Sequence, residues 1–418
     1  MKKGAILASS IVLVEKIIFS QYKAKSALNN FFRKNKYAGS KDKILIRELV
    51  FKFLKNYFTL QEICKNNLIN FSFRNALLIY YFSINKKEKL KDIYEGKFSI
   101  KPEKIDSKIH KLSISAKKEI IPVLPIWLEA KLTKEFKNKL KENYRSILEE
   151  PRFDIRINKH LTDRNKILKL LNQNNILAKK TSYSPLGITI KKRIVEKKIR
   201  QIKKNLFEVQ DEASQIITLL SGAKKGMKVL DYCAGKGTKT IALYEKMKAK
   251  GNIFIYDVNE DRLKVLKKRL KNLKIHNKIS MFNNTINFHN YFDLILLDVP
   301  CSGSGVWRRR PDEMIKLDLT KYKKNLKIQA SILKKAAKYI SKNGLISYIT
   351  CSLFADENEI QIKKFLSNNK AFKLVDINIV LKKELKNINL RSTHKWLTIT
   401  PNYINSDGFF ICLLKKYA

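Results

Sequence analysis

Apolar residues recur every three or four positions over much of the first part of the chain, with polar residues between them. This spacing is typical of helices that bury one face. Residues 44–58 and 61–71 show it, and few Gly or Pro interrupt the region. Pro122 and Pro125 then interrupt the pattern and mark a boundary. The pattern predicts an all-helical domain over residues 1–125.

Residues 31–42 are interpreted as a loop between two of these helices. Gly39 is expected to end the first helix, because glycine readily takes the left-handed conformation found at helix ends. Ser40 or Asp42 is expected to cap the second helix, since either side chain can accept a backbone hydrogen bond.

A short apolar run over residues 5–14 follows Lys2 and Lys3. It superficially resembles a signal peptide, but it lacks a small-x-small cleavage site and continues into Glu15 and Lys16. We interpret it as a first amphipathic helix. No apolar stretch reaches the ~18 residues that a membrane-spanning helix needs, so no membrane partner is expected.

A mixed pattern follows over residues 126–205. Residues 153–157 alternate between apolar and polar positions, as a half-buried strand does. Thr162 is expected to cap a helix over residues 163–171, and residues 187–190 predict another strand. The pattern predicts a small α+β domain between the helical region and the rest of the chain.

Short apolar runs alternate with helical stretches over residues 206–418. This alternation is typical of a doubly wound α/β domain with a mainly parallel sheet. The expected strands are 229–231, 253–257, 279–282, 292–298, 344–350 and 409–414, and the expected helices include 238–248 and 260–271.

The chain holds 87 Lys and Arg against 37 Asp and Glu, which gives a formal net charge of +50. Such an excess repels itself unless an anion compensates it, and nucleic acid is the usual partner. A composition imposed by an AT-rich genome explains part of the excess but not the shortage of acids. The basic run over residues 191–204 is either a solvated face or a surface that contacts phosphates.

Five cysteines, an odd number, exclude a disulfide scaffold, and no two of them form a C-x-x-C pair. A structural zinc site is therefore not expected, and we predict no metal. Free thiols fit a reducing cytoplasm, which is the expected location of the protein.

The segment over residues 231–240 joins the first expected strand of the α/β domain to its first helix. Gly235 and Gly237 permit a tight turn and a close approach of a ligand to the backbone. Asp257 ends the next strand, where an acid can accept hydrogen bonds from a ribose diol. These features predict an adenosine-containing cofactor. The turn is not a Walker loop, and on this pattern alone a dinucleotide stays possible.

Two cysteines follow later strands of the same domain. Cys301 lies in the run Asp-Val-Pro-Cys-Ser-Gly, which begins at Asp298, and Cys351 lies in Thr-Cys-Ser. Ligands of open α/β sheets bind at the carboxyl ends of strands, where both cysteines fall. Either cysteine alone would be interpreted as a buried, unreactive thiol. Two cysteines beside the same expected crevice favour a catalytic role.

These motifs resemble those of the RNA (cytosine-5)-methyltransferases of the RsmB/Sun (Fmu) and NSUN type. The resemblance covers residues 206–418, and residues 126–205 resemble the small RNA-binding domain that precedes the catalytic one. The N-terminal helices are only weakly similar to the NusB-like domain of bacterial members. The resemblance implies a Rossmann-like doubly wound methyltransferase domain, preceded by a small α+β domain and an all-helical domain that binds RNA.

The resemblance also assigns roles. Cys351 matches the nucleophile, and Cys301 matches the second cysteine, which assists product release. Asp298 matches the acid beside the target ring and the cofactor, and Asp257 matches the acid that holds the ribose. The loop that holds the methionine and adenosine parts of S-adenosyl-L-methionine matches Cys233, Ala234, Gly235, Lys236, Gly237, Thr238 and Lys239.

Two departures from the family pattern stand out. Where the family often reads Cys-Ala-Ala-Pro-Gly-Gly-Lys-Thr, Gly235 and Lys236 replace Ala-Pro, and Thr238 replaces the second Gly. Cofactor binding is still expected. Where the family commonly has an acid near the adenine, this chain has Asn283 and Asn284, and the Asn284 amide is kept as a cofactor contact because it can donate or accept a hydrogen bond.

Arg308, Arg309 and Arg310 directly follow the Pro-Cys loop. A solvated cluster is one interpretation of them. Their place beside the expected active site favours contacts with RNA phosphates.

The resemblance implies methylation of carbon 5 of cytosine in RNA through a covalent Cys–cytosine adduct, with ribosomal RNA favoured as substrate. Transfer RNA stays an alternative substrate for the same chemistry. A second alternative is a non-catalytic RNA-binding or antitermination protein, although such a protein need not keep both Cys301 and Cys351. A nicotinamide dehydrogenase would leave both cysteines without a use. We expect a monomer.

Overall fold

The computed structural model describes residues 1–115, 123–191, 205–283, 288–386 and 388–417. These residues form two compact units, and each is discontinuous in the chain. One unit, here called the helical unit, comprises Met1–Leu148 and Trp307–Leu317, and the other, the sheet unit, comprises Glu149–Val306 and Asp318–Ala418. Pro122, Asn284 and most of the basic run over 191–204 lie outside the described residues. The expected domain limits at 125 and 205 stay predictions.

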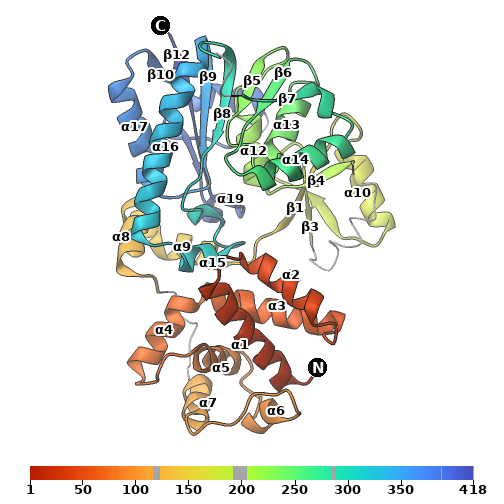
Figure 1. Cartoon of the computed structure of the whole chain (residues 1–418), viewed down its shortest axis with the longest axis vertical. Helices are drawn as coiled ribbons and strands as arrows, with labels where there is room; N and C mark the ends of the chain where they lie inside the picture. The colour runs from red at the N-terminus through yellow and green to blue at the C-terminus, as the bar shows by residue number, and fades with distance from the viewer. Residues whose placement is uncertain (116–122, 192–204, 284–287, 387, 418) are drawn as a thin grey trace. The chain divides into compact units, whose positions relative to one another are not determined.

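The helical unit, whose helices are labelled in Figure 1, buries one apolar face of each of its main helices, as the spacing predicts. Leu13 and Ile17 of the first helix, Ile46 and Phe53 of the third and Leu78 of the fifth are fully or almost fully buried in one core. The helices are α1 (Lys3–Phe19), α2 (Ala24–Lys34), α3 (Ser40–Lys55), α4 (Tyr57–Asn66), α5 (Phe73–Ile84), α6 (Leu90–Tyr94), α7 (Asp106–Ser115), α8 (Ile126–Phe136) and α9 (Leu140–Leu148).

A segment from the second half of the chain completes the helical unit. It carries the short helix α15 (Pro311–Ile315). The Asp312 carboxylate accepts a hydrogen bond from the Ala24 backbone N–H at 3.1 Å, and Lys316 Nζ donates to the Ser20 carbonyl at 3.0 Å. No local pattern in the sequence predicted that residues 307–317 belong to the helical unit.

Two expected helix caps are wrong in detail. Gly39 does not end α2; it is the N-cap of α3, because the Asp42 carboxylate reaches back to accept the Gly39 N–H at 2.9 Å. In the small domain Asp163, not Thr162, caps helix α10 (Arg164–Gln173), because its carboxylate accepts the Lys166 N–H at 3.0 Å. In both cases a carboxylate supplies the acceptor.

The small sheet of the sheet unit is antiparallel, with the order β2-β3-β1-β4. Its isoleucines at 155, 157 and 188 pack against Ile167 and Leu171 of α10. The predicted strands over 153–157 and 187–190 are confirmed. The strands are β1 (Phe153–Ile157), β2 (Ala178–Lys180), β3 (Gly187–Ile190) and β4 (Phe207–Val209).

The large sheet confirms the predicted doubly wound α/β fold. Its strand order is β10-β12-β9-β8-β5-β6-β7, and β11 pairs with β12. The five strands from β7 to β9 are parallel, and β10, β11 and β12 pair antiparallel. The strands are β5 (Lys228–Asp231), β6 (Asn252–Ile255), β7 (Ile279–Met281), β8 (Phe292–Asp298), β9 (Ile340–Thr350), β10 (Phe372–Val375), β11 (Leu397–Ile399) and β12 (Phe409–Lys416).

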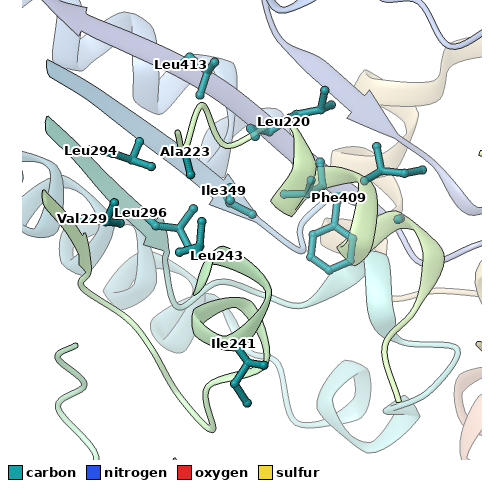
Figure 2. Close-up of a cluster of buried hydrophobic side chains, with 14 of the residues drawn as sticks. Leu220, Ala223, Val229, Ile241, Leu243, Leu294, Leu296, Ile349, Phe409 and Leu413 are labelled. Atoms are coloured by element: carbon teal, nitrogen blue, oxygen red, sulfur yellow. The ribbon is translucent and has the colours of Figure 1, made fainter. Parts of the chain in front are cut away.

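Successive residues of the central strands face opposite sides of this sheet, and helices cover both sides. Leu294 and Leu296 belong to a core with α12, α13, α14 and α18, whereas Ile295 and Leu297 belong to a core with α16 and α17. Figure 2 shows part of the first core, where Leu294 and Leu296 gather with Leu243 of α13. The helices are α12 (Glu212–Leu219), α13 (Thr238–Lys246), α14 (Glu260–Asn272), α16 (Leu319–Tyr339), α17 (Glu359–Asn368) and α18 (Ile377–Glu384).

Among the described residues, no helix combines the length and the apolar composition that crossing a bilayer requires.

Candidate active site

The candidate site lies where the strand order of the large sheet reverses. From β5 the chain goes to β6 and β7 on one side, and then returns to β8 and β9 on the other. The carboxyl ends of strands flanking such a switch point form a crevice for ligands. The expected site residues at the ends of β5, β6, β8 and β9 therefore come together at one edge of the sheet.

The turn after β5 depends on its glycines. Gly235 and Gly237 have φ of 56° and 81°, in the left-handed region that favours glycine. Gly237 is also the N-cap of α13, and a Cβ there would collide with the Leu266 side chain of α14. The tight turn that the sequence predicted is therefore present, and it packs closely on α14.

Asp257, just after β6, is fixed beside this turn. Its carboxylate accepts the Gly235 N–H and the Asn259 N–H, each at 2.8 Å, and its side chain is nearly buried. A carboxylate oxygen can accept more than one hydrogen bond, so acceptor capacity is left for the two hydroxyls of a ribose. The geometry fits the expected role of Asp257.

Asp231, at the end of β5, is a residue that the sequence analysis did not select. One of its carboxylate oxygens accepts the Thr240 hydroxyl at 2.7 Å, and the other is buried without a hydrogen-bond partner among the described residues. Burial raises its pKa to about 7; the negative charges of Asp298 and Asp257 add to this, while Thr240 and Lys239 oppose it. A cationic ligand group would supply the missing partner. The sequence feature that could have identified Asp231 is an acidic residue at the end of a strand, just before a glycine-containing turn.

Lys239 and Asp298 form an ion pair of 2.7 Å between α13 and the end of β8. Burial alone would lower the pKa of Lys239, but attraction to Asp298, the hydrogen bond with it and the Cys351 sulfur outweigh burial, so this pKa is raised. Lys239 therefore stays a cation at the edge of the sheet. It joins the cofactor turn to the acid that the resemblance places beside the target ring.

The two cysteines meet at the ends of adjacent parallel strands. The Sγ atoms of Cys301 and Cys351 are 3.4 Å apart, and the Gly305 N–H donates to the Cys351 carbonyl at 2.9 Å. The hydrogen bond with Cys351, burial and nearby negative charge raise the pKa of Cys301 well above its usual range. Cys301 therefore stays a thiol at neutral pH, and either sulfur could be the donor in the contact between the two cysteines. The sequence predicted this proximity from strand ends alone.

The other expected residues have different environments. Cys233 is partly exposed, and burial of its sulfur together with Asp231 raises its pKa, so it remains a thiol. Arg308 is 1% exposed, which does not suit a surface contact with phosphate in this conformation, whereas Arg309 is half-buried and Arg310 is exposed. The RNA contact stays a prediction for all three arginines, and Arg309 and Arg310 are the more exposed. In the described part of the chain, no cluster of three or more His, Cys, Asp or Glu could hold a metal ion.

Family models match two parts of the chain. The model described as 16S rRNA methyltransferase RsmB/F matches residues 217–415, and the RsmF/B-like ferredoxin-like domain matches residues 124–195. The ribosomal RNA small subunit methyltransferase B of Photorhabdus laumondii is 30% identical over 298 residues, which are 70% of this chain and 66% of the relative. The probable ribosomal RNA small subunit methyltransferase B of Bacillus subtilis is 29% identical over 64% of this chain and 60% of its own length. The chain thus spans slightly less than two thirds of these relatives.

Solved structures show the same fold. The structure of PH0851 matches 100% of this chain and 99% of its own chain, with a TM-score of 0.77 and 21% identity. The structure of NSun6 from Pyrococcus horikoshii with SFG matches 70% of this chain and 98% of its own, with a TM-score of 0.59 and 18% identity. The two family models follow one another along residues 124–415, and together with the curated relatives they confirm the resemblance. The chain therefore belongs to the RsmB/F family of methyltransferases.

Proposed function

We propose that this protein methylates carbon 5 of cytosine in RNA, with S-adenosyl-L-methionine as methyl donor and small-subunit ribosomal RNA as substrate. One observation carries the proposal: two cysteine sulfurs lie 3.4 Å apart beside an Asp298–Lys239 pair, at the edge of a methyltransferase sheet. The names of the family model and of the curated relatives support ribosomal RNA as the substrate.

The residues present fit the cofactor. Asp257 would accept hydrogen bonds from the ribose hydroxyls, and the buried unpartnered oxygen of Asp231 would accept one from the methionine ammonium. The glycine turn lets the ligand approach the backbone closely. S-adenosyl-L-methionine supplies a methyl group on a sulfonium. The carboxylates of Asp231, Asp257 and Asp298 give the crevice the negative potential that such a cation needs.

Cys351 is the nucleophile in this proposal. Carbon 5 of cytosine is a poor nucleophile in an aromatic ring, and addition of a thiolate to carbon 6 makes carbon 5 enamine-like. Cys351 reacts as a thiolate beside the Lys239 ammonium, which stabilises negative charge there. Asp298, paired as a carboxylate with Lys239 in the free protein, would take up a proton and donate a hydrogen bond to N3 of the ring, which disperses the charge that develops during the addition.

Cys301 acts at the end of the reaction. After methyl transfer, the proton on carbon 5 must leave to a base, and the bond between carbon 6 and Cys351 must break with its electron pair returning to sulfur. Cys301 lies 3.4 Å from that sulfur, so its thiol can donate a hydrogen bond to the departing Cys351 sulfur while water takes the proton from carbon 5. The protonated state of its thiol in the free protein fits a role as a hydrogen-bond donor and not as the attacking group.

Bisulfite sequencing of RNA from cells with and without the gene tests the proposal. We expect one or a few cytosines of small-subunit ribosomal RNA to be protected only when the gene is present. Protection confined to transfer RNA would keep the chemistry and change the substrate. Identical patterns in all RNA would contradict the proposal.

A further inference from the structure

A buried glutamate holds the loop that carries Cys301. Glu357 has no exposed surface, and its carboxylate accepts the Ser302 N–H at 2.9 Å and also the Ser302 hydroxyl. It also accepts Gln329 Nε2 at 3.0 Å, and the same amide nitrogen donates to the Pro300 carbonyl at 3.0 Å. The residues on both sides of Cys301 are therefore anchored through one carboxylate.

The same network reaches the loop of the other cysteine. The hydroxyl of Ser302 lies 3.1 Å from that of Ser352, the residue after Cys351. The hydroxyl of Ser304 lies 3.3 Å from that of Ser352 and accepts the Leu353 N–H at 2.8 Å. Three hydroxyls thus join the two loops, and Glu357 accepts from this group at Ser302.

Hydrogen-bond donors surround the buried carboxylate of Glu357. Burying a charge is unfavourable unless hydrogen bonds compensate it, and here burial raises the pKa of Glu357 while donors from Ser302, Ser352 and Gln329 oppose the shift. The Tyr348 hydroxyl bonds to the backbone carbonyl of Glu357, so a change of the side chain leaves that contact in place. The side chain therefore serves the two loops.

We propose that Glu357 is a positioning residue of the reaction: its carboxylate fixes the Pro-Cys loop so that the Cys301 thiol stays within hydrogen-bonding reach of the Cys351 sulfur. The effect of Glu357 on the reaction rests on the proposed function, in which the Cys301 thiol assists product release. Nothing in the sequence pattern singled out Glu357, since its role depends on burial between two loops.

Electrostatics adds a second effect of the same carboxylate. Its negative charge is among the causes, after Cys351 and burial, that raise the pKa of Cys301. Other titratable groups near Glu357 include Tyr348, Tyr322 and Asp356, whose carboxylate accepts the Tyr322 hydroxyl at 2.9 Å. Burial raises the pKa of both tyrosines, so neither is charged at neutral pH. Removing the Glu357 charge should therefore make the Cys301 thiolate easier to form.

The first measurement needs no RNA. We would record initial rates of Cys301 alkylation by iodoacetamide against pH, by peptide mass spectrometry of the full chain. In Glu357→Gln the profile should move to lower pH and the rate at pH 8 should rise roughly threefold or more, as loss of a nearby charge predicts. Glu359→Gln is the matched control, since Glu359 makes no described hydrogen bond to either cysteine loop and is expected to leave the profile unchanged.

The second measurement follows the adduct. With RNA and S-adenosyl-L-methionine, Glu357→Gln should release the covalent protein–RNA complex about tenfold or more slowly than Glu359→Gln, while KM for the cofactor stays the same. If Glu357→Gln does not fold, Ser302→Ala removes one donor to the carboxylate and should shift both readouts in the same direction. Folded variants that match the control in alkylation and release would overturn the inference. A shifted alkylation profile without any adduct in the wild type would contradict the proposed function and leave the positioning role standing.

Discussion

At the residue scale, Asp231 links cofactor binding to pH. Burial raises its pKa to about 7, above the ordinary value of 3.8. Between pH 3.8 and pH 7, Asp231 is therefore protonated in the folded protein and ionised in the unfolded chain. This proton stabilises the folded state, and the stabilisation is lost as pH rises toward 7. A bound cationic ligand favours the ionised form of Asp231 instead of the protonated form.

Binding of S-adenosyl-L-methionine should consequently weaken as pH falls. Affinity should drop roughly 20-fold between pH 7.5 and pH 5.5, in step with the ionised fraction of a group of pKa near 7. Calorimetry in buffers of different ionisation enthalpy would detect the proton released on binding. In Asp231→Asn the affinity should be weaker and independent of pH over this range. A flat profile in the wild type would remove Asp231 from the cofactor site.

Residues that end apolar runs could be predicted from the sequence, and residues that act through burial could not. Cys301, Cys351 and Asp257 each follow a strand, so the carboxyl-edge rule placed them in one crevice. Asp231 and Glu357 were missed because their roles depend on what surrounds them in three dimensions. Asp231 has one buried oxygen without a partner among the described residues, and Glu357 lies between two loops that are 50 residues apart.

At the scale of elements, the junction between β5 and α13 depends on Gly237. Alanine there meets a positive φ of 81° and a collision with Leu266, whereas Gly226 has φ of 89° and nothing within 4 Å of a Cβ. Gly226→Ala should lose about 1 kcal/mol of unfolding free energy, and Gly237→Ala about 2–4 kcal/mol, because overpacking adds to backbone strain. Chemical denaturation of both variants measures the difference. Equal losses of unfolding free energy in the two variants would mean that the Leu266 side chain of α14 does not restrict residue 237.

The strands from β7 to β9 and β12 followed the hydrophobic pattern, and the two strands that pair only with β12 did not. Strands β5, β6, β8 and β12 were predicted within a few residues because their apolar runs are buried on both faces. Strands β10 and β11 have only four and three residues and were missed. Both strands pair with β12, and such tertiary contacts cannot be predicted from the local hydrophobic pattern.

At the scale of the whole molecule, the net charge of +50 predicts strongly salt-dependent RNA binding. If about six phosphates are neutralised, affinity should fall roughly 10²–10³-fold between 50 and 200 mM salt. Fluorescence anisotropy with a labelled ribosomal RNA fragment would give the slope. An affinity that hardly changes would make the charge a matter of composition and not of RNA binding.

The domain organisation shows where a linear pattern stops being informative. The three successive domains stay a prediction, while by compactness the described residues form two units and residues 307–317 belong to the helical unit. That return depends on single contacts such as Asp312 to the Ala24 N–H. The segment begins directly after the Pro-Cys loop in the chain, which no periodicity could relate to the N-terminal helices.

In the proposed mechanism Cys351 attacks the base and Cys301 assists product release. Denaturing electrophoresis of protein mixed with RNA and S-adenosyl-L-methionine distinguishes the two roles. Without Cys351 no bond to carbon 6 can form, so Cys351→Ala should lose both methylation and the covalent complex. Without Cys301 the bond forms and the methyl group transfers, but elimination stalls, so Cys301→Ala should accumulate a complex that survives denaturation. Cys412→Ala, which changes a buried cysteine on β12 away from both loops, is the matched control. A trapped complex in Cys351→Ala but not in Cys301→Ala would reverse the assignment, and its absence from both variants would contradict the covalent mechanism.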